Sequence, residues 1–412
     1  MEVKPGYKQT EVGVIPEEWA TKRLGEVATI ATGNTPPTSD VTNYGDEFLF
    51  VGPVDMGDVK FIAKTEKMLS KKGFAMSRRF PKDSILFVSI GSTIGKCGIA
   101  PVELTSNQQI NAIFPSSSFS ADYLFYAVSS AAPRIKAQAG EQAVPIVNKT
   151  QFSETVVALP PLPEQRAIAT ALSDVDGLLG GLDRLIAKKR DLKQAAMQQL
   201  LTGSTRLPGF HGEWEVKRLG QLAEMGSGGT PPSSVAAYYD GDIPWASISD
   251  MTKGGKVILS TDRNLTREGF RNCAAQMFPV GTVLYAMYAS LGECSIAGIP
   301  LCSSQAILGI RPKDGLNGEF LYYFLTSLKA KVKTLGQQGT QANLNKGMVQ
   351  DFRLSLPSPS EQTAIAEVLT EMDSELAGLE QRRDKTRSLK QAMMQELLTG
   401  KIRLVAPQEV HS

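Results

Sequence analysis

The chain has 412 residues, of which 42% are apolar and 21% are charged, as in a folded protein of two or three domains. There is no run of about 20 apolar residues to cross a membrane and no basic and apolar leader at the N-terminus, so we expect a cytoplasmic protein. Four cysteines without C-x-x-C spacing and only two histidines argue against a disulfide framework or a zinc site, and we expect no bound metal.

The net charge is only +2, but basic residues are concentrated in two segments. Residues 60–82 contain eight lysines and arginines against one glutamate, and residues 253–271 contain five against two acidic residues. A nearly neutral chain with two basic segments is typical of a protein that binds an anion such as DNA at two places. A solvated charged surface would explain any single lysine equally well.

The first 160 residues mix short apolar runs with turn residues. Residues 84–91 (SILFVSIG) have the continuous apolar pattern of a buried strand, and residues 122–130 (DYLFYAVSS) are typical of a helix. The segment from Gly91 to Lys96 resembles a phosphate-binding loop, but one residue is missing between its glycines, and Cys97 follows instead of serine or threonine. We interpret this segment as a turn and the region as an α+β domain built around a curved sheet.

A long helix is predicted from Glu164 to Gly203. Its apolar residues recur at alternating steps of four and three, the pattern of a narrow coiled-coil seam, and a proline-rich turn precedes it. At about 1.5 Å per residue the helix would be on the order of 55 Å long and would act as a spacer. Gly177, Gly180 and Gly181 weaken it, which indicates either close backbone approach or a local weak point. The alternative is an amphipathic helix packed in an ordinary core.

The whole arrangement is repeated. The segment from Glu361 to Gly400 aligns with the first helix at an offset of 197 residues, and the strand-like and helical runs return at 282–290 and 319–327. A period this long means duplicated domains rather than a solenoid. The predicted helix-pairing seam comprises Ile168, Leu172, Val175, Leu179, Leu182 and Ile186 in the first copy and Ile365, Leu369, Met372, Leu376 and Leu379 in the second. The predicted order is a domain (1–160), a helix (161–204), a domain (205–357), a helix (358–404) and a tail (405–412).

Several motifs together resemble the specificity subunit of type I restriction-modification systems. They are the opening YKQTEVGVIPEEW, the repeated W-x-x-x-R-L-G and G-x-T-P-P sequences, and the twin E-Q-x-x-I-A helices that end in L-L-T-G. The likeness covers the chain from about Tyr7 to Leu404. It implies an α+β fold with two tandem target-recognition domains, separated by two long antiparallel coiled-coil-like helices in a pseudo-twofold arrangement.

The resemblance also implies a function. Each domain would read one half of a bipartite, asymmetric sequence in double-stranded DNA, while the helices would set the spacing and dock two methyltransferase subunits. Complexes of the family usually contain two ATP-dependent restriction or translocase subunits as well. The chain itself would catalyse nothing, and S-adenosylmethionine, ATP and magnesium would be bound by the partner subunits. The sequence agrees, since it contains no G-x-G-x-x-G motif and no histidine placed as a base beside a nucleophile.

Comparison of the two copies separates scaffold residues from candidate reading residues. Residues identical in both domains, such as Trp19 and Trp214, are expected to maintain the fold, and residues that differ in matching basic loops are candidates for DNA contact. Arginine can bridge guanine O6 and N7, whereas lysine contacts phosphate as readily. The predicted DNA-binding residues are Lys71, Lys72, Arg78, Arg79 and Lys96 in the first domain and Tyr238, Tyr239, Lys253, Lys256, Arg263, Arg267, Arg271 and Tyr288 in the second.

Two other functions stay open from the sequence. A duplicated protein-interaction scaffold would show no salt-dependent affinity for DNA, whereas phosphate binding weakens steeply with salt. An enzyme with an unrecognised site would show turnover by the purified chain alone, and one substitution would abolish it.

Overall fold

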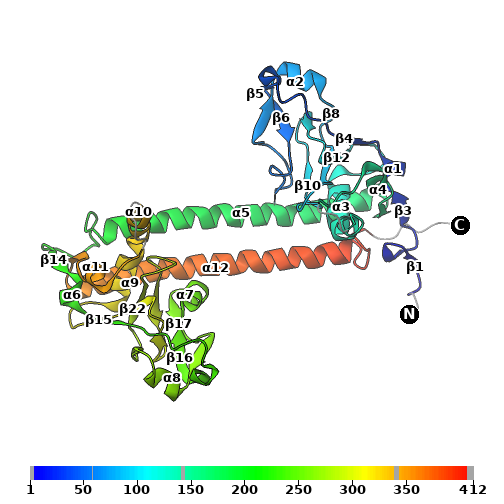
Figure 1. The fold of residues 1–412 in the computed structure, drawn as a ribbon. Helices are drawn as coiled ribbons and strands as arrows, with labels where there is room; N and C mark the ends of the chain where they lie inside the picture. The colour runs from blue at the N-terminus through cyan, green and yellow to red at the C-terminus, as the bar shows by residue number, and fades with distance from the viewer. Residues whose placement is uncertain (1–3, 58, 141–143, 338–342, 406–412) are drawn as a thin grey trace. The chain divides into compact units, whose positions relative to one another are not determined.

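The computed structural model describes residues 4–57, 59–140, 144–337 and 343–405, which form two compact units. Unit 1 combines Met1–Leu182 with Arg382–Ser412, and unit 2 is Asp183–Gln381. Each of the two long helices, α5 (Leu162–Leu200) and α12 (Pro359–Leu397), is therefore divided between the units (Figure 1). Of the predicted tail, only Val405 lies within the described residues.

Domain 1, the part of unit 1 that precedes α5, contains two larger sheets. The inner sheet has the strand order β10-β9-β12-β4 and is antiparallel, while the outer sheet has the order β5-β7-β6-β11-β8 and contains one parallel pair, β11 with β6. The elements are β1 (Tyr7–Thr10), β2 (Gly13–Pro16), β3 (Ala20–Arg23), α1 (Leu24–Val27), β4 (Ile30–Thr32), η1 (Val41–Asn43), β5 (Tyr44–Gly45), β6 (Phe48–Val51), β7 (Lys67–Leu69), α2 (Lys71–Met76), β8 (Arg79–Phe80), β9 (Ile85–Val88), β10 (Cys97–Ile99), β11 (Leu104–Ser106), β12 (Ile110–Ile113), α3 (Ala121–Ala137), α4 (Lys149–Ser153) and β13 (Val156–Leu159).

Strand β9 confirms the buried strand predicted at 84–91. Ile85 and Phe87 belong to the hydrophobic cluster that includes α3, whereas Leu86 and Val88 belong to a second cluster on the other face of the sheet. Successive strand residues point to opposite faces. The apolar run is continuous rather than alternating because both faces of the inner sheet are covered.

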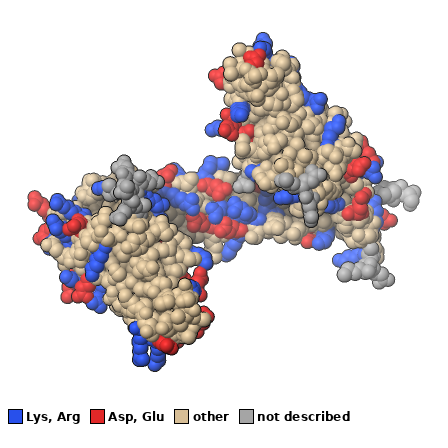
Figure 2. Space-filling view, in the orientation of Figure 1, with Lys and Arg blue, Asp and Glu red and all other residues tan. Residues whose placement is uncertain are grey.

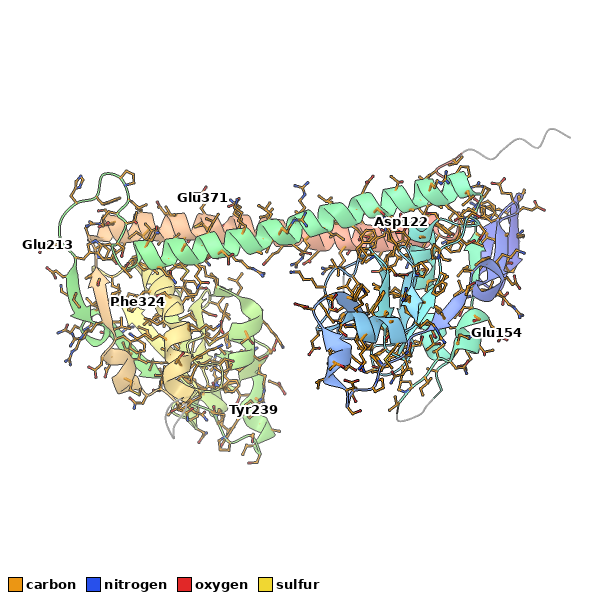
Figure 3. All side chains as sticks on the ribbon, turned by 90° about the horizontal axis from the view of Figure 1, so that it is seen from above. Asp122, Glu154, Glu213, Tyr239, Phe324 and Glu371 are labelled. Carbon is orange, nitrogen blue, oxygen red and sulfur yellow. The ribbon has the colours of Figure 1, made fainter. Side chains whose placement is uncertain are left out.

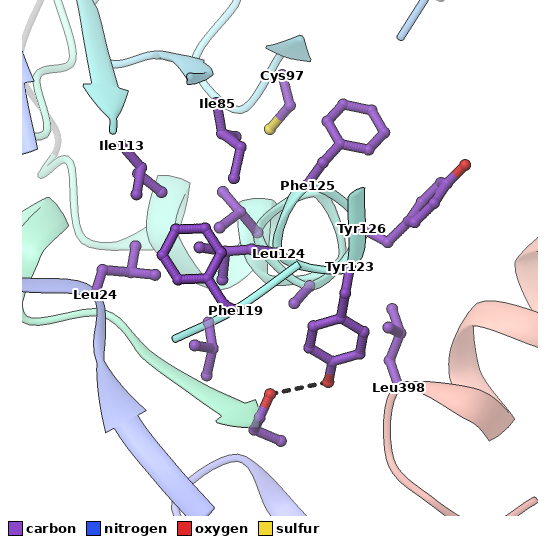
Figure 4. Packing of buried hydrophobic residues seen from close by; sticks show 14 of the residues in the cluster. Leu24, Ile85, Cys97, Ile113, Phe119, Tyr123, Leu124, Phe125, Tyr126 and Leu398 are labelled. Atoms are coloured by element: carbon purple, nitrogen blue, oxygen red, sulfur yellow. Dashed lines mark hydrogen bonds between the residues drawn. The ribbon is translucent and has the colours of Figure 1, made fainter. Parts of the chain in front are cut away.

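Helix α3 confirms the helix predicted at 122–130 and covers the inner sheet. It begins after Ser120, whose hydroxyl accepts the backbone N–H of Tyr123. Figure 4 shows Leu124 of α3 packed beside Ile85, and the Tyr123 hydroxyl donating to the carbonyl of Ala158 at 2.9 Å. This bond ties α3 to β13, the strand that leads into α5.

The outer sheet of domain 1, with η1 and α2, forms outer lobe 1. It lies at the end of domain 1 farthest from α5 (Figure 1). A Cβ atom on Gly73 of α2 would lie 2.0 Å from the carbonyl oxygen of Asn43, and one on its counterpart Gly269 would lie 2.2 Å from that of Tyr238. Only glycine allows this close approach, so the identity of the two residues reflects the scaffold.

Domain 2, the part of unit 2 between the long helices, repeats this plan. Its inner sheet has the order β15-β22-β19-β20-β17, and its outer sheet, β18-β16-β21, forms outer lobe 2 together with η2 and α8. The elements are β14 (Glu215–Arg218), α6 (Leu219–Leu222), β15 (Ala223–Ser227), η2 (Ala236–Tyr238), β16 (Tyr239–Ala246), α7 (Ile248–Gly254), β17 (Val257–Ile258), β18 (Arg263–Leu265), α8 (Arg267–Arg271), β19 (Val283–Ala286), β20 (Cys294–Ala297), β21 (Cys302–Ser303), β22 (Ile307–Pro312), α9 (Gly318–Ser327), α10 (Lys329–Gln337), α11 (Lys346–Gln350) and β23 (Arg353–Leu356). The strand and helix predicted at 282–290 and 319–327 are confirmed as β19 and α9.

The long helices are α5 (Leu162–Leu200) and α12 (Pro359–Leu397). In unit 1, Ile168 near the start of α5 packs in one cluster with Leu397 at the end of α12, and in unit 2, Leu200 packs with Ile365. In each unit the start of one helix therefore meets the end of the other, as the antiparallel prediction requires. Every residue of the predicted seam is buried or half-buried. No described helix is long and apolar enough to cross a membrane.

The Gln of each E-Q-x-x-I-A motif joins a long helix to its domain. The Gln165 amide donates to the carbonyl of Pro160 at 2.8 Å and accepts the backbone N–H of Ser120 at 2.9 Å. Gln362 bonds in the same way to Pro357 at 2.9 Å and Asn317 at 2.8 Å. Because Ser120 and Asn317 are the N-cap residues of α3 and α9, this one side chain fixes two helix starts against each other.

The Glu of the same motif is a buried ion-pair partner. The Glu164 carboxylate accepts Trp19 Nε1 at 3.0 Å and Arg403 Nη2 at 2.8 Å, and only 2% of its side chain is exposed. Glu361 likewise accepts Trp214 Nε1 at 3.2 Å and Arg206 Nη2 at 2.7 Å. Each arginine follows a long helix in sequence, so the chain after each helix is attached to the start of the other.

Replacing Gly177 and Gly181 of α5 together by alanine should stabilise unit 1. No heavy atom of the described residues would lie within 4 Å of a Cβ at either position, which favours the weak-point interpretation over close backbone approach. Each glycine inside a helix costs roughly 0.5 to 1 kcal/mol relative to alanine, so the double variant should gain about 1 to 2 kcal/mol. Thermal denaturation of the full chain measures the gain. Gly73→Ala is the control and should lower the melting temperature. A melting temperature of the double variant below that of the wild type would contradict the prediction.

Candidate functional site

Four of the basic residues predicted in domain 1 lie on outer lobe 1. Lys71 and Lys72 begin α2 and are both exposed. Lys72 Nζ lies 2.7 Å from a carboxylate oxygen of Asp40, and this hydrogen bond, together with two from Thr42, lowers the pKa of Asp40 to about 2. Lys72 therefore has a partner whose charge a bound phosphate would have to replace.

Arg78 and Arg79 connect α2 to the outer sheet. Arg78 Nη1 donates to the carbonyl of Thr32, and its backbone N–H donates to the Asn34 side chain, both at 2.6 Å. The Arg79 guanidinium lies 5.1 Å from the ring centre of Phe74. These contacts hold Arg78 beside the G-x-T-P-P loop and Arg79 against α2, and both arginines are exposed. Lys96 lies elsewhere, in an exposed turn between β9 and β10 of the inner sheet.

Outer lobe 2 carries the arginines predicted in domain 2. The Arg263 guanidinium lies 4.2 Å from the ring centre of Tyr239 and 5.7 Å from that of Trp245. Such stacking holds the planar guanidinium in a fixed orientation. Arg267 and Arg271 are exposed at the two ends of α8. In Figure 2, lysine and arginine side chains protrude at the α8 end of unit 2, with acidic side chains beside them.

The three predicted tyrosines differ in position. Tyr238 is half-buried on η2. Tyr288 is half-buried against the hydrophobic cluster between the inner sheet of domain 2 and α9. Tyr239, labelled in Figure 3, is buried in outer lobe 2, and its hydroxyl donates to the carbonyl of Pro231 at 2.7 Å. Tyr239 thus belongs to the core of outer lobe 2, and the Arg263 guanidinium lies over its ring.

The two predicted lysines of domain 2 both form ion pairs within the chain. Lys253 on α7 pairs with Asp262 at 2.8 Å, and this hydrogen bond raises the pKa of Lys253. Lys256 is only 19% exposed, and its Nζ contacts Glu319 at 3.2 Å and Thr370 of α12 at 2.8 Å. The structure therefore directs Lys256 toward α9 and α12 rather than toward the surface of outer lobe 2.

A cleft in outer lobe 1 contains a basic residue that was not among the predicted DNA-binding residues. The cleft has a volume of about 320 Å³, and its lining includes Thr35, Tyr44, Phe50, Lys67 and Gln109. Aromatic, amide and cationic groups are the side chains that contact bases and phosphates. Lys67 is the one basic residue of this lining, which also includes Asp55 and Glu66.

Lys67 and Arg263 occupy the same position in the two domains. Lys67 of β7 is paired with Phe50 of β6, and Arg263 of β18 is paired with Trp245 of β16. The lysine lines an open cleft, whereas the arginine covers the matching aromatic residues. An alignment of the two short strands was the signal that could have identified Lys67 from the sequence.

Comparison with known proteins places both halves of the chain in one family. The family model described as the type I restriction modification DNA specificity domain matches residues 16–186 and again 211–386. The MjaIX specificity subunit of Methanocaldococcus jannaschii is 32% identical over 39% of this chain and 38% of its own length. The MjaVIII specificity subunit of the same organism is 24% identical over 95% of this chain and 94% of its own.

A solved structure shows the same fold. The type I restriction-modification S subunit from M. genitalium matches with a TM-score of 0.60 at 15% identity, covering 96% of this chain and 98% of that one. The relatives are named as specificity subunits, the non-catalytic components of these enzymes. The chain therefore belongs to the family of type I restriction-modification DNA specificity subunits.

Proposed function

We propose that the chain recognises a bipartite, asymmetric DNA sequence and that each domain reads one half of it. The observation that carries this proposal is the pair of outer lobes, which have matched backbones and different side chains. Lys67 stands where Arg263 stands in the other lobe, and Lys72 of α2 corresponds to Glu268 of α8. Two readers with one scaffold and unlike charges would bind unlike half-sites.

The long helices are proposed to set the spacing of the half-sites in a pseudo-twofold arrangement and to dock two methyltransferase subunits. Leu185 and Leu192 of α5, one heptad apart, are 39% and 47% exposed, and Leu389 of α12, the counterpart of Leu192, is 56% exposed. Exposed leucines at heptad spacing suit contact with further helices. The partners, including two restriction or translocase subunits, would supply S-adenosylmethionine, ATP and magnesium chemistry.

Mapping of adenine methylation tests the proposal directly. Cells that express the partner methyltransferase with this chain should methylate a gapped, two-part motif that is absent without it. Exchanging residues 1–160 for those of a relative should change one half of the motif and leave the other intact. A contiguous motif, or methylation that does not depend on the chain, would contradict the two-reader proposal.

A second measurement separates DNA binding from a scaffold role. The affinity of the assembled complex for its mapped target should fall steeply between about 50 and 200 mM salt, because bound phosphates release counterions. Affinity that does not change with salt would favour the protein-interaction scaffold.

A further inference from the structure

A polar cluster joins domain 1 to both long helices. Lys60, in the connection between β6 and β7, lies with Nζ 2.6 Å from Asp122 of α3 and donates to the Ser173 hydroxyl of α5 at 2.8 Å. Figure 3 shows Asp122 beside α5. Only 11% of the Lys60 side chain is exposed, so its charge depends on these partners. We call this cluster clamp 1; its members are Lys60, Asp122, Tyr126, Ser173, Asp176 and Lys390.

The second part of clamp 1 brings in α12. The Tyr126 hydroxyl of α3 donates to Asp176 of α5 at 2.7 Å. Lys390 of α12 lies 2.6 Å from the same carboxylate and 5.4 Å from the Tyr126 ring centre. Burial raises the pKa of Tyr126, so its hydroxyl stays protonated and can donate. Tyr126 therefore contacts side chains of both long helices.

Unit 2 contains an equivalent cluster, formed by the matching residues of the repeat. Lys256 contacts Glu319 at 3.2 Å and Thr370 at 2.8 Å, and the Tyr323 hydroxyl donates to Asp373 at 2.7 Å. Lys193 of α5 pairs with Asp373 and lies 5.5 Å from the Tyr323 ring centre. The members of clamp 2 are Lys193, Lys256, Glu319, Tyr323, Thr370 and Asp373.

The residue types in the clamps suit them to hold each domain at one position on the long helices. Each contains two lysines and two carboxylates, and each lysine is at most 23% exposed. A partly buried charge that loses its partner is strongly unfavourable, whereas apolar burial is non-directional. Sliding a helix by one residue moves it about 1.5 Å, which breaks a hydrogen bond yet is less than half the base-pair rise of about 3.4 Å. The clamps can therefore hold position more finely than one base pair.

We propose that the two clamps are positioning sites that fix each recognition domain on the helix pair and thereby determine which spacer length between half-sites is accepted. This rests on the proposed function, because only a two-part target has a spacer. Tyr126 and Tyr323 are the central positioning residues, since each contacts groups from both long helices.

Tyr126→Phe and Tyr323→Phe test the proposal in the full chain assembled with its methyltransferase subunits. Binding is measured on duplexes that carry the mapped half-sites with the native spacer or one base pair more or less. The wild type should prefer the native spacer. Each variant should lose about tenfold of that preference, the effect of one hydrogen bond to a charged group, while its half-site sequences stay unchanged. Thr370→Val provides a milder variant of clamp 2 if Tyr323→Phe does not assemble.

Tyr123→Phe is the matched control. It removes a buried hydroxyl from the same helix α3, but that hydroxyl bonds to Ala158 and not to the clamp. It should lower the melting temperature without altering the spacer preference. The proposal is overturned if the clamp variants keep the wild-type preference, or if Tyr123→Phe changes it equally. Absence of any two-part motif in the methylation map would instead refute the proposed function.

Discussion

Replacing Glu164 by glutamine should lower the free energy of unfolding of unit 1 by about 3 kcal/mol, the lower end of the range for breaking a buried ion pair by removing one partner. Glutamine keeps an acceptor for Trp19 Nε1 but leaves the Arg403 guanidinium, only 18% exposed, without its buried counter-charge. Arg403 also pairs with Glu18, which limits the loss. Urea or thermal denaturation of the full chain measures the effect.

Glu154→Gln is the control for this prediction, because Glu154 is exposed (Figure 3) and its replacement should change stability by less than about 0.5 kcal/mol. Adding Arg403→Met to Glu164→Gln should recover part of the loss, since the unpaired charge is then gone. Equal midpoints for Glu164→Gln and Glu154→Gln would show that the ion pair does not stabilise unit 1.

The sequence predicts the long helices well but not the role of their first residues. Spacing and prolines identify where each helix begins, because those signals are local. The partners of Glu164, Trp19 and Arg403, lie 145 and 239 residues away. No periodicity connects such distant positions, so the motif could be recognised from the sequence while its chemistry could not.

The candidate DNA-binding residues show the same limit. Composition shows where basic and aromatic residues are concentrated along the chain, yet it does not indicate which face each side chain occupies. Tyr239 is turned into the lobe by its bond to Pro231, and Lys256 is drawn to α12 by Thr370. Conversely, Lys67 lies in the basic segment 60–82, and strand pairing shows that it stands opposite Phe50.

Replacing Arg263 by lysine should weaken binding to the half-site read by domain 2 by about fivefold or more, because a bidentate base contact contributes roughly 1 to 3 kcal/mol. The Tyr239 and Trp245 rings hold the Arg263 guanidinium at 4.2 and 5.7 Å. Lysine keeps the charge but loses the planar fork and its stacking. The measurement is affinity at fixed salt for duplexes that carry single-base changes across each half-site.

The pattern of losses identifies what Arg263 contacts. A base contact should relax discrimination at one position of a single half-site, whereas a phosphate contact should weaken all sequences alike and reduce the salt slope by about 1. Lys67→Arg is the reciprocal variant, because Lys67 holds the same strand position in domain 1, and its effect should be confined to the other half-site. If either substitution changes both half-sites equally, or neither, the matched strand position does not determine specificity and the reading residues must lie elsewhere on the outer lobes.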